Sequence, residues 1–331
     1  MKISSEMVPQ ENGELVVSTE ASSYTSIRKK GKAHSTILPA SRPETEAGPG
    51  GTAPIVVVLA QVAPRLGNLT ANLELHATAI AGARRYGADL VVFPELSMTG
   101  YFLEDLVPEV AITIDSPILK ELAGLSRGIA LVAGCVLESE DSRFFNAALY
   151  FQDGELLHVH RKVYLPTYGL FDEQRYFAAG NRFSTFSAAL GSDQARQWKV
   201  GILICEEMWH PSAPGLLARQ GVDLFICTSA SPGRGVAPGA GLGTAHSYDA
   251  ITRTYGQLYT SYLLYTNRSG YEDGVAFWGG SRVIGPDGSV IAEASRKEEM
   301  LQAELSLAQL RRTRIAFPLL RDERHDLESD Q

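Results

Sequence analysis

Short apolar segments that end in a reactive side chain recur along this sequence. Residues 200–204 read Val-Gly-Ile-Leu-Ile, and Cys205 follows them directly. A continuous apolar run of this length is typical of a strand that is buried on both faces. Two further strand-like segments run into Glu95 and Lys162 in the same way. The chain is therefore expected to contain buried strands whose ends carry a thiol, a carboxylate and an ammonium.

Helical patterns alternate with these strands. Residues 68–86 carry apolar side chains at helical spacing, and Asn68 and Gly87 suit the start and the end of a helix. The alternation, with hairpins inserted, indicates an α/β fold whose sheets are covered by helices. The other predicted elements are helices at 116–127, 213–220 and 246–256, and strands at 55–59, 90–93, 129–137, 145–151, 155–160, 200–204, 223–228, 261–266, 280–285, 289–294 and 300–305.

The two ends of the chain differ in composition from the part between them. Residues 1–52 are polar and lack periodicity, so they could not bury enough apolar surface to offset their ordering entropy. They are predicted to be a disordered polar extension. Residues 53–310 are expected to form the folded domain, and residues 311–331 a charged C-terminal tail.

Charge and cysteine content exclude several classes of protein. A net charge of −8 argues against nucleic-acid binding. A membrane span would need roughly 18 consecutive apolar residues, which the sequence lacks, and we expect no membrane partner. The spacing of the three cysteines fits neither a zinc site nor a disulfide framework. A reducing compartment follows, so we expect a cytoplasmic protein.

A thiol, a carboxylate and an ammonium can together hydrolyse a carbon–nitrogen bond. Attack by a thiolate divides the reaction into formation and hydrolysis of a thioester. Glu95 can take the thiol proton, pass it to departing ammonia and then activate water. Lys162 and the backbone N–H that follows Cys205 can stabilise the oxyanion. These groups complete the chemistry, so neither a cofactor nor a metal is expected.

The residues around the three groups resemble the motifs of the nitrilase, or carbon–nitrogen hydrolase, superfamily. The resemblance implies a four-layer α-β-β-α sandwich with a catalytic Glu-Lys-Cys triad formed by Glu95, Lys162 and Cys205. It also implies a homodimer or larger assembly. The matching segments are FPELSMTGY at 93–101, RKVYLP at 161–166 and GILICEEMW at 201–209.

Within the superfamily, the sequence most resembles the glutaminase domain of glutamine-dependent NAD synthetases. Residues 168–177 and 229–232 carry this resemblance. The sequence contains no Ser-Gly-Gly-x-Asp-Ser pyrophosphatase loop, and Trp278 stands where that family usually has an aspartate. A free-standing amidase is therefore expected. It would hydrolyse a small carboxamide, glutamine-like or an ω-amide, and release ammonia.

Further site residues are implied by the same motifs and by the loop that follows the strand at 223–228. Glu173 resembles an acidic residue that orients the lysine, with a solvated loop charge as the alternative. Tyr101 and Tyr168 match aromatic pocket residues, although plain packing would also explain them. The remaining predicted substrate contacts are polar: Glu206, Ser231 and Arg234.

Alternative interpretations concern the reaction and the histidines. The same triad would serve an N-carbamoyl amino acid hydrolase, and a catalytically silent partner protein could keep the fold. His158 and His160 have metal-like spacing, but no third ligand is evident, so no zinc site is predicted. Trp209 is expected to pack beneath the cysteine turn.

Overall fold

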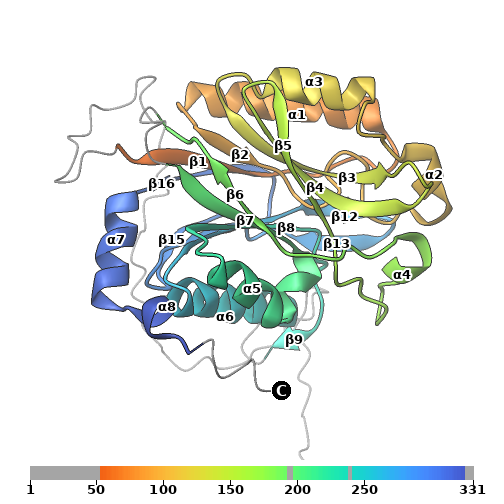
Figure 1. Cartoon of the computed structure of the whole chain (residues 1–331). Helices are drawn as coiled ribbons and strands as arrows, with labels where there is room; N and C mark the ends of the chain where they lie inside the picture. The colour runs from red at the N-terminus through yellow and green to blue at the C-terminus, as the bar shows by residue number, and fades with distance from the viewer. Residues whose placement is uncertain (1–52, 192–196, 238–240, 325–331) are drawn as a thin grey trace, which may run out of the picture. The chain divides into compact units, whose positions relative to one another are not determined.

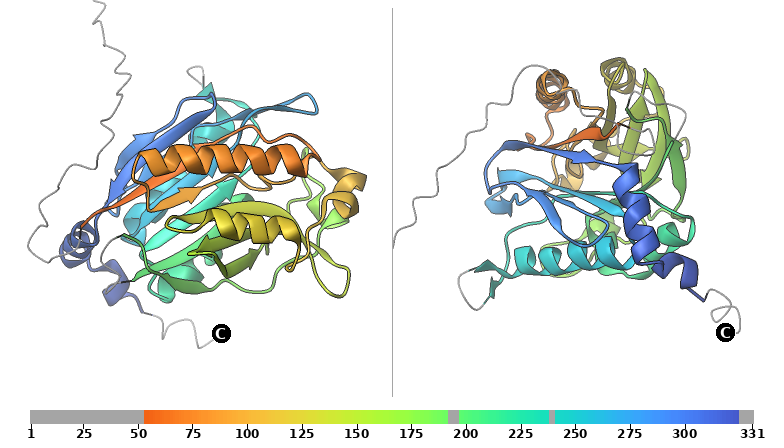
Figure 2. Two further views of the ribbon diagram at one scale, coloured as in Figure 1. Left: turned by 90° about the horizontal axis from the view of Figure 1, so that it is seen from above. Right: turned by 90° about the vertical axis from the view of Figure 1, so that its left-hand side faces the viewer.

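Two six-stranded sheets pack face to face, and helices cover the outer face of each (Figures 1 and 2). The computed structural model describes residues 53–191, 197–237 and 241–324. The strand orders are β16-β1-β2-β3-β4-β5 in the first sheet and β15-β14-β11-β8-β7-β6 in the second. The predicted four-layer α-β-β-α sandwich is confirmed.

The first sheet lies beneath α1 (Leu69–Arg85) and α3 (Pro117–Leu125), which run side by side above it in Figure 1. Asn68 and Ser116 cap these helices by accepting hydrogen bonds from backbone N–H groups. The strands of this sheet are β1 (Ile55–Gln61), β2 (Leu90–Val92), β3 (Ala130–Glu138), β4 (Phe144–Gln152), β5 (Glu155–Arg161) and β16 (Glu299–Leu305).

The second sheet is covered by α5 (Ser212–Arg219) and α6 (Gly243–Leu258). Strands β7, β8 and β11 run parallel, so their carboxyl ends meet at one edge of the sheet. The strands of this sheet are β6 (Thr185–Ala188), β7 (Trp198–Ile204), β8 (Leu224–Ser229), β11 (Tyr262–Asn267), β14 (Arg282–Ile284) and β15 (Val290–Glu293).

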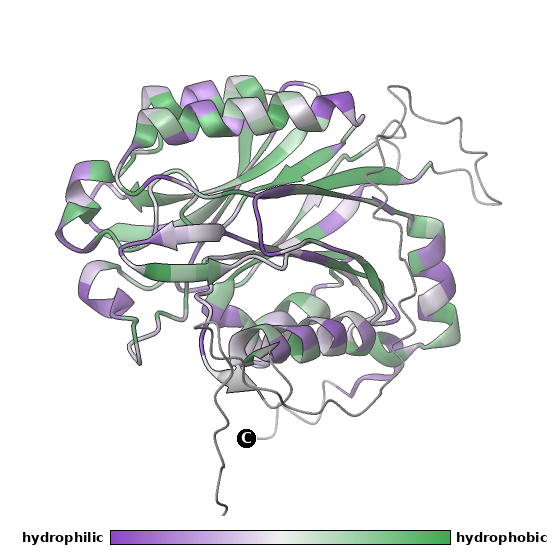
Figure 3. Ribbon diagram, turned by 180° about the vertical axis from the view of Figure 1, so that it is seen from behind, coloured by the Kyte–Doolittle hydropathy of each residue, from purple (hydrophilic) through white to green (hydrophobic). Residues whose placement is uncertain are grey.

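Alternating side chains of each central strand enter two different hydrophobic cores. Val57 and Leu59 of β1 join the core between the sheets, whereas Val56 and Val58 pack in the core beneath the helices. Both faces of the strand are therefore buried, which explains its unbroken apolar run. The hydropathy colouring of Figure 3 shows the same preference for apolar residues along the strands between the helical layers.

Several short elements were not predicted. One is the hairpin of β12 (Ser269–Glu272) and β13 (Val275–Trp278), which turns at Asp273-Gly274, where both residues have positive φ. This dipeptide is a sequence signal typical of hairpins. The others span too few residues to show periodicity: η1 (Glu104–Leu106), α2 (Val107–Val110), α4 (Glu173–Tyr176), β6, β9 (Val236–Ala237), β10 (Gly241–Leu242) and α8 (Leu319–Asp322).

The predicted domain boundary at residue 310 falls inside a helix, α7 (Leu307–Ala316). Arg314 of α7 donates hydrogen bonds to the Asp223 carboxylate at 2.6 Å and to the carbonyl oxygen of Val222 at 2.6 Å. These bonds attach α7 beside β8. Residues 311–316 belong to α7 and residues 319–322 form α8, so most of the segment predicted as a charged tail is helical where the structure describes it. The predicted extension at 1–52 and residues 325–331 of the predicted tail lie outside the described residues.

None of the helices in the described ranges is long and apolar enough to cross a membrane.

A glycine in β3 allows the chain that leaves β2 to cross it closely. A Cβ atom at Gly134 would meet the backbone nitrogen of Leu96, and would lie 2.8 Å from the carbonyl oxygen of Pro94. Leu96 has a positive φ of 50°, so this turn is already in a left-handed conformation that side chains rarely adopt. The glycine thus sets how closely the turn bearing Glu95 can approach the sheet.

Gly134→Ala should lower the free energy of unfolding by about 1–3 kcal/mol, because the added methyl group would push the turn off the sheet. Gly82→Ala in α1 is the matched control. A Cβ atom there meets nothing within 4 Å, and alanine favours a helix interior by roughly 0.5–1 kcal/mol. Urea denaturation measures both changes, and a Gly134→Ala variant as stable as the wild type would contradict the close approach.

Candidate active site

The turn that carries Glu95 is held by a buried histidine. Ser97 Oγ lies 3.0 Å from His76 Nε2 and accepts a hydrogen bond from the backbone N–H of Gly134 at 3.1 Å. His76 Nδ1 lies 2.7 Å from the carbonyl oxygen of Asn72, so Nδ1 carries the proton and Nε2 accepts from Ser97. Burial lowers the pKa of His76 to about 4, so the ring is neutral at pH 7. These contacts fix the direction in which Glu95 points.

Both oxygens of the Glu95 carboxylate accept hydrogen bonds in the protein interior. Oε1 lies 2.7 Å from Lys162 Nζ and 2.8 Å from Asn146 Nδ2, and Oε2 lies 2.8 Å from the backbone nitrogen of Ala230. Asn146 is on β4 and Ala230 follows β8, so donors from both sheets hold one carboxylate. Asn146 was not predicted as a site residue.

Lys162 follows β5 and is almost fully buried between two carboxylates. Its Nζ lies 2.7 Å from Oε1 of Glu95 and 2.7 Å from Oε1 of Glu173. Burial alone would lower the pKa of Lys162, but the charges of Glu173 and Glu95 outweigh burial and hold the pKa well above its usual value. Lys162 therefore remains an ammonium at neutral pH.

Glu173 lies at the start of α4 and is buried, so it is no solvated loop charge. Its Oε1 accepts a hydrogen bond from Tyr101 Oη at 2.5 Å in addition to the one from Lys162. Burial raises the pKa of Glu173 to about 7; Lys162 opposes this rise, and the charge of Glu95 adds to it.

Cys205 begins the 3-10 helix η2 (Cys205–Trp209) at the end of β7, with a positive φ of 45°. A non-glycine residue in this conformation carries backbone strain of the kind found at functional sites. Burial, followed by the charge of Glu95, raises the pKa of the Cys205 thiol to about 12, whereas Lys162 lowers it. The charges of Glu95 and Lys162 thus both act on the sulfur. Because the resting thiol keeps its proton at pH 7, attack requires a base.

Glu207 connects the segment that bears Lys162 to the segment that bears Cys205. Its carboxylate accepts hydrogen bonds from the backbone N–H groups of Val163 and Ile204, each at 2.7 Å, and from His160 Nε2 at 2.7 Å. Glu207 was not predicted as a site residue; the only signal in the sequence was an acidic residue two positions after the cysteine, and its burial is visible only in the structure.

The histidine pair of β5 does not form a metal site. His160 is bonded to Glu207, while the ring of His158 stacks on Phe186 with 4.4 Å between centroids. Within the part of the chain that the structure describes, no group of three or more His, Cys, Asp or Glu side chains could hold a metal ion.

A cavity of about 460 Å³ opens beside Cys205. Within it, Tyr168 Oη donates a hydrogen bond to Glu206 Oε2 at 2.8 Å, and the Arg234 guanidinium lies 5.9 Å from the centre of the Phe171 ring. Four of the five predicted substrate contacts line this cavity: Tyr168, Glu206, Ser231 and Arg234.

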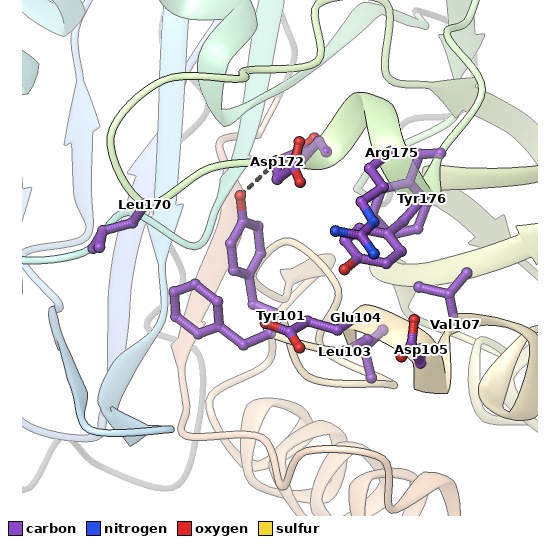
Figure 4. Close-up of a pocket in the computed structure, with 12 residues that line it drawn as sticks. Tyr101, Leu103, Glu104, Asp105, Val107, Leu170, Asp172, Arg175 and Tyr176 are labelled. Atoms are coloured by element: carbon purple, nitrogen blue, oxygen red, sulfur yellow. Dashed lines mark hydrogen bonds between the residues drawn. The ribbon is translucent and has the colours of Figure 1, made fainter.

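Tyr101, the fifth predicted contact, faces a different cavity of about 270 Å³ that also reaches Glu173. Figure 4 shows its phenol pointing toward the segment that carries Asp172, with Arg175 and Tyr176 farther along the same wall. Its hydroxyl contacts Glu173 and it does not line the Cys205 cavity, so substrate contact by Tyr101 stays a prediction.

Trp209 departs from its predicted place beneath the cysteine turn. It is 39% exposed and lines the Cys205 cavity, where its Nε1 donates a hydrogen bond to Tyr248 Oη at 3.2 Å. Tyr248 and Ser229 both contact Cys205 Sγ, yet neither was predicted. No spacing rule links them to Cys205, because α6 and β8 reach it only through the fold.

The chain is similar to several known proteins. Residues 57–315 match the family model described as carbon-nitrogen hydrolase. A glutamine-dependent NAD(+) synthetase of Acinetobacter baylyi is 33% identical over 264 residues, which cover 78% of this chain and 46% of the relative. The chain thus spans about half the length of the curated NAD synthetases it matches.

Other similar proteins are matched over nearly their whole length. An (R)-stereoselective amidase of Pseudomonas sp. is 30% identical over 283 residues, which cover 83% of this chain and 93% of the relative. The crystal structure of a carbon-nitrogen hydrolase from Helicobacter pylori superposes with a TM-score of 0.71 at 26% identity, covering 84% of this chain and 98% of that one. The two-sheet sandwich is therefore the fold of these proteins.

The raised pKa of Glu173 makes the stability of the protein depend on pH. Between the ordinary pKa of 4.5 and about 7, the folded carboxyl group holds a proton that the unfolded one has lost. Its contribution to stability is therefore present below pH 4.5 and is lost as the pH rises to 7. Glu173→Gln removes this titration. The free energy of unfolding of the variant relative to wild type should thus increase between about pH 5 and pH 8, by more than about 1 kcal/mol.

Urea denaturation at both pH values measures this change. Glu74→Gln, at an exposed position of α1, controls for the loss of one carboxyl group. A stability difference between Glu173→Gln and wild type that stays constant with pH would contradict the raised pKa.

Proposed function

Because this chain belongs to the carbon–nitrogen hydrolase family, we propose that it hydrolyses the C–N bond of a small linear carboxamide through a thioester on Cys205, releasing ammonia. One observation carries the proposal. Glu95 and Lys162, which come from separate motifs, are hydrogen-bonded to each other, and their charges act on the Cys205 thiol at the wall of a cavity.

In the first half of the proposed reaction, Sγ of Cys205 attacks the amide carbon while Glu95 takes the thiol proton. A carbon–sulfur bond forms, and the carbonyl electron pair moves to oxygen. Lys162 and the backbone N–H of Glu206 are the donors available to stabilise this oxyanion. Glu95 then delivers the proton to nitrogen, the C–N bond breaks, and ammonia leaves behind a thioester.

In the second half, Glu95 takes a proton from water as the water oxygen attacks the thioester carbon. The carbon–sulfur bond breaks, sulfur regains a proton from Glu95, and the carboxylic acid departs. The hydrogen bonds from Ala230 and Asn146 support this role, because they hold the Glu95 carboxylate in place through both halves. Glu173 has a positioning role: its Oε1 lies 2.7 Å from Lys162 Nζ and holds the ammonium together with Glu95.

The charges of the cavity favour a substrate of the glutamine type. Glu206 and Arg234 line the same cavity and carry opposite charges, which suits an α-ammonium and an α-carboxylate on one molecule. Relatives that are named glutamine-dependent point to the same class of substrate. An N-carbamoyl amino acid would offer Arg234 a carboxylate but would bring no ammonium to Glu206, so it is the second candidate.

Assembly and compartment are proposals that rest on the family resemblance and the composition. We infer a homodimer or larger homo-oligomer, located in the cytoplasm, that needs no cofactor and has no nucleic-acid partner. A catalytically silent partner protein is disfavoured, because such a protein has no need of a buried lysine between two carboxylates together with a thiol that lines a cavity.

Cys205→Ala should abolish ammonia release from a panel of glutamine, simple primary amides and N-carbamoyl amino acids, because alanine supplies no nucleophile. Cys135→Ala, which changes a buried thiol in β3, is the matched control and should retain activity. An enzyme-coupled ammonia assay measures the rates, and carbon dioxide release alongside ammonia would identify the carbamoyl reaction. Activity that survives in Cys205→Ala would rule out the thioester route.

Substitutions of the two cavity charges should separate their roles. Glu206→Gln should lower kcat/KM for glutamine by about 10–100-fold, since a hydrogen bond to a charged group contributes about 1.5–3 kcal/mol. The same change should leave glutaramate, which lacks the ammonium, almost unaffected. Arg234→Gln should lower kcat/KM for both substrates, because both present a carboxylate.

Butyramide, which has neither charge, is the control substrate for both variants. A uniform loss of activity on glutamine, glutaramate and butyramide would show that Glu206 and Arg234 support the site without recognising the substrate charges.

A further inference from the structure

Two hydroxyl groups contact the sulfur of Cys205, and the triad chemistry makes no use of either. Ser229 Oγ, at the end of β8, lies 3.2 Å from Sγ, and Tyr248 Oη, on α6, lies 3.3 Å from it. Both residues are buried, with side chains at most 1% exposed. Two polar groups from different elements therefore converge on one sulfur atom inside the protein.

The neighbours of Tyr248 determine which way its hydrogen bond to sulfur runs. Trp209 Nε1 lies 3.2 Å from Tyr248 Oη, and an indole N–H can only donate. The Tyr248 oxygen therefore accepts from Trp209, and its own proton is available for Sγ. Among the described residues, the Tyr248 hydroxyl has no hydrogen-bonding partner other than Trp209 Nε1 and Cys205 Sγ.

A second series of hydrogen bonds reaches the sulfur through Ser229. Tyr265 Oη donates to Ser229 Oγ at 3.3 Å, and Ser229 Oγ donates to Sγ of Cys205. Burial raises the pKa of Tyr248 and of Tyr265 well above the usual value, so both phenols keep their protons. Each of these two series of hydrogen bonds thus ends in a hydroxyl whose hydrogen points at the sulfur. Because both phenols keep their protons, neither is an anion that could compete for the thiol proton.

The ring of Trp278 lies next to both tyrosines of this network. Its ring stacks on Tyr265, with centroids 6.0 Å apart, and lies 6.4 Å from the ring of Tyr248. This is the position at which the family resemblance leads one to expect an aspartate. An indole there places no negative charge behind the two tyrosines and offers them no acceptor, so their hydroxyls remain directed toward Ser229 and Cys205.

We propose that Tyr248 and Ser229 are further catalytic residues that donate hydrogen bonds to Sγ of Cys205 as it becomes negatively charged. The inference rests on the proposed function, in which Cys205 is the nucleophile. Neither hydroxyl gives up its proton: the thiol proton passes to Glu95, and the two donors stabilise the sulfur both as it attacks and as it leaves the thioester. Hydrogen bonds to an ionised acceptor are about twice as strong as those between neutral groups, so the donors favour thiolate over thiol.

Other groups around the sulfur also change the pKa of the Cys205 thiol, and some of them oppose the two donors. Burial, followed by the charge of Glu95 beyond β2, raises the pKa of the thiol. Lys162, beyond β5, lowers it, as do the hydroxyls of Ser229 and Tyr248. Cys227 of β8 is buried close by and interacts with the Cys205 thiol. Removing one hydroxyl should therefore raise the pKa of Cys205.

The test is the rate at which iodoacetamide alkylates Cys205, followed by mass spectrometry of the Cys205 peptide across a range of pH. Loss of one hydrogen bond to the thiolate corresponds to a shift of about one pH unit, which lowers the thiolate fraction about tenfold. A more basic thiolate is also more nucleophilic, with a Brønsted coefficient of about 0.4–0.5, so the net loss in rate is roughly threefold.

Tyr248→Phe and Ser229→Ala should each show this threefold loss at every pH below the thiol pKa, and the double variant roughly tenfold. Tyr255→Phe is the matched control, since it removes a phenol hydroxyl from the same helix without touching the sulfur. Ser229→Thr keeps the donor and should alkylate at the wild-type rate. Thermal unfolding of each variant checks that the fold is retained.

Two outcomes would overturn the inference. One is alkylation of Cys205 in Tyr248→Phe and Ser229→Ala at the wild-type rate across the pH range. The other is a loss in Ser229→Thr equal to that in Ser229→Ala, which would indicate a packing effect. Failure of the proposed function would look different, because wild-type protein would then release no ammonia from any amide while the alkylation rates of the variants still differed.

Discussion

The buried ion cluster around Lys162 is the interaction on which the site depends. Taking an ammonium and two carboxylates out of water is expensive, and their mutual attraction offsets this cost only with good geometry and further hydrogen bonds. Asn146, Ala230 and Tyr101 supply those bonds. Because these donors come from both sheets and from the loop after β2, the cluster forms only when the two sheets are packed together. Stability and the geometry of the site are therefore coupled.

The thiol lies in an environment that disfavours the charged form. Burial and Glu95 raise the pKa of Cys205, and Lys162 opposes them only in part. A resting thiol beside a fixed carboxylate suits a reaction in which proton removal accompanies attack, as in the proposed mechanism. The hydroxyls of Ser229 and Tyr248 add donors that need no reorientation when sulfur gains charge. The charges of Lys162 and Glu95 and the hydroxyls of Ser229 and Tyr248 thus all act on the sulfur of Cys205, although they come from separate elements.

Rigid supports behind the site explain how such distant segments keep their positions. Glu207 accepts backbone hydrogen bonds from the residue after Lys162 and from the residue before Cys205, so it holds the two segments together. Gly134 lets the Glu95 turn approach β3 closely. Neither residue contacts the proposed reacting atoms. Both nevertheless fix the distances over which those atoms would meet.

The sequence alone determined the strand–helix alternation and the three strand ends that carry Glu95, Lys162 and Cys205, because apolar periodicity and flanking motifs are local properties. It also placed Tyr168, Glu206, Ser231 and Arg234 in segments that line one cavity. Only the tertiary structure brought Asn146, Ser229 and Tyr248 to the site and turned Tyr101 toward Glu173. Contacts between residues far apart in the chain depend on how the two sheets pack and on where α6 lies on the second sheet. No local pattern records that packing.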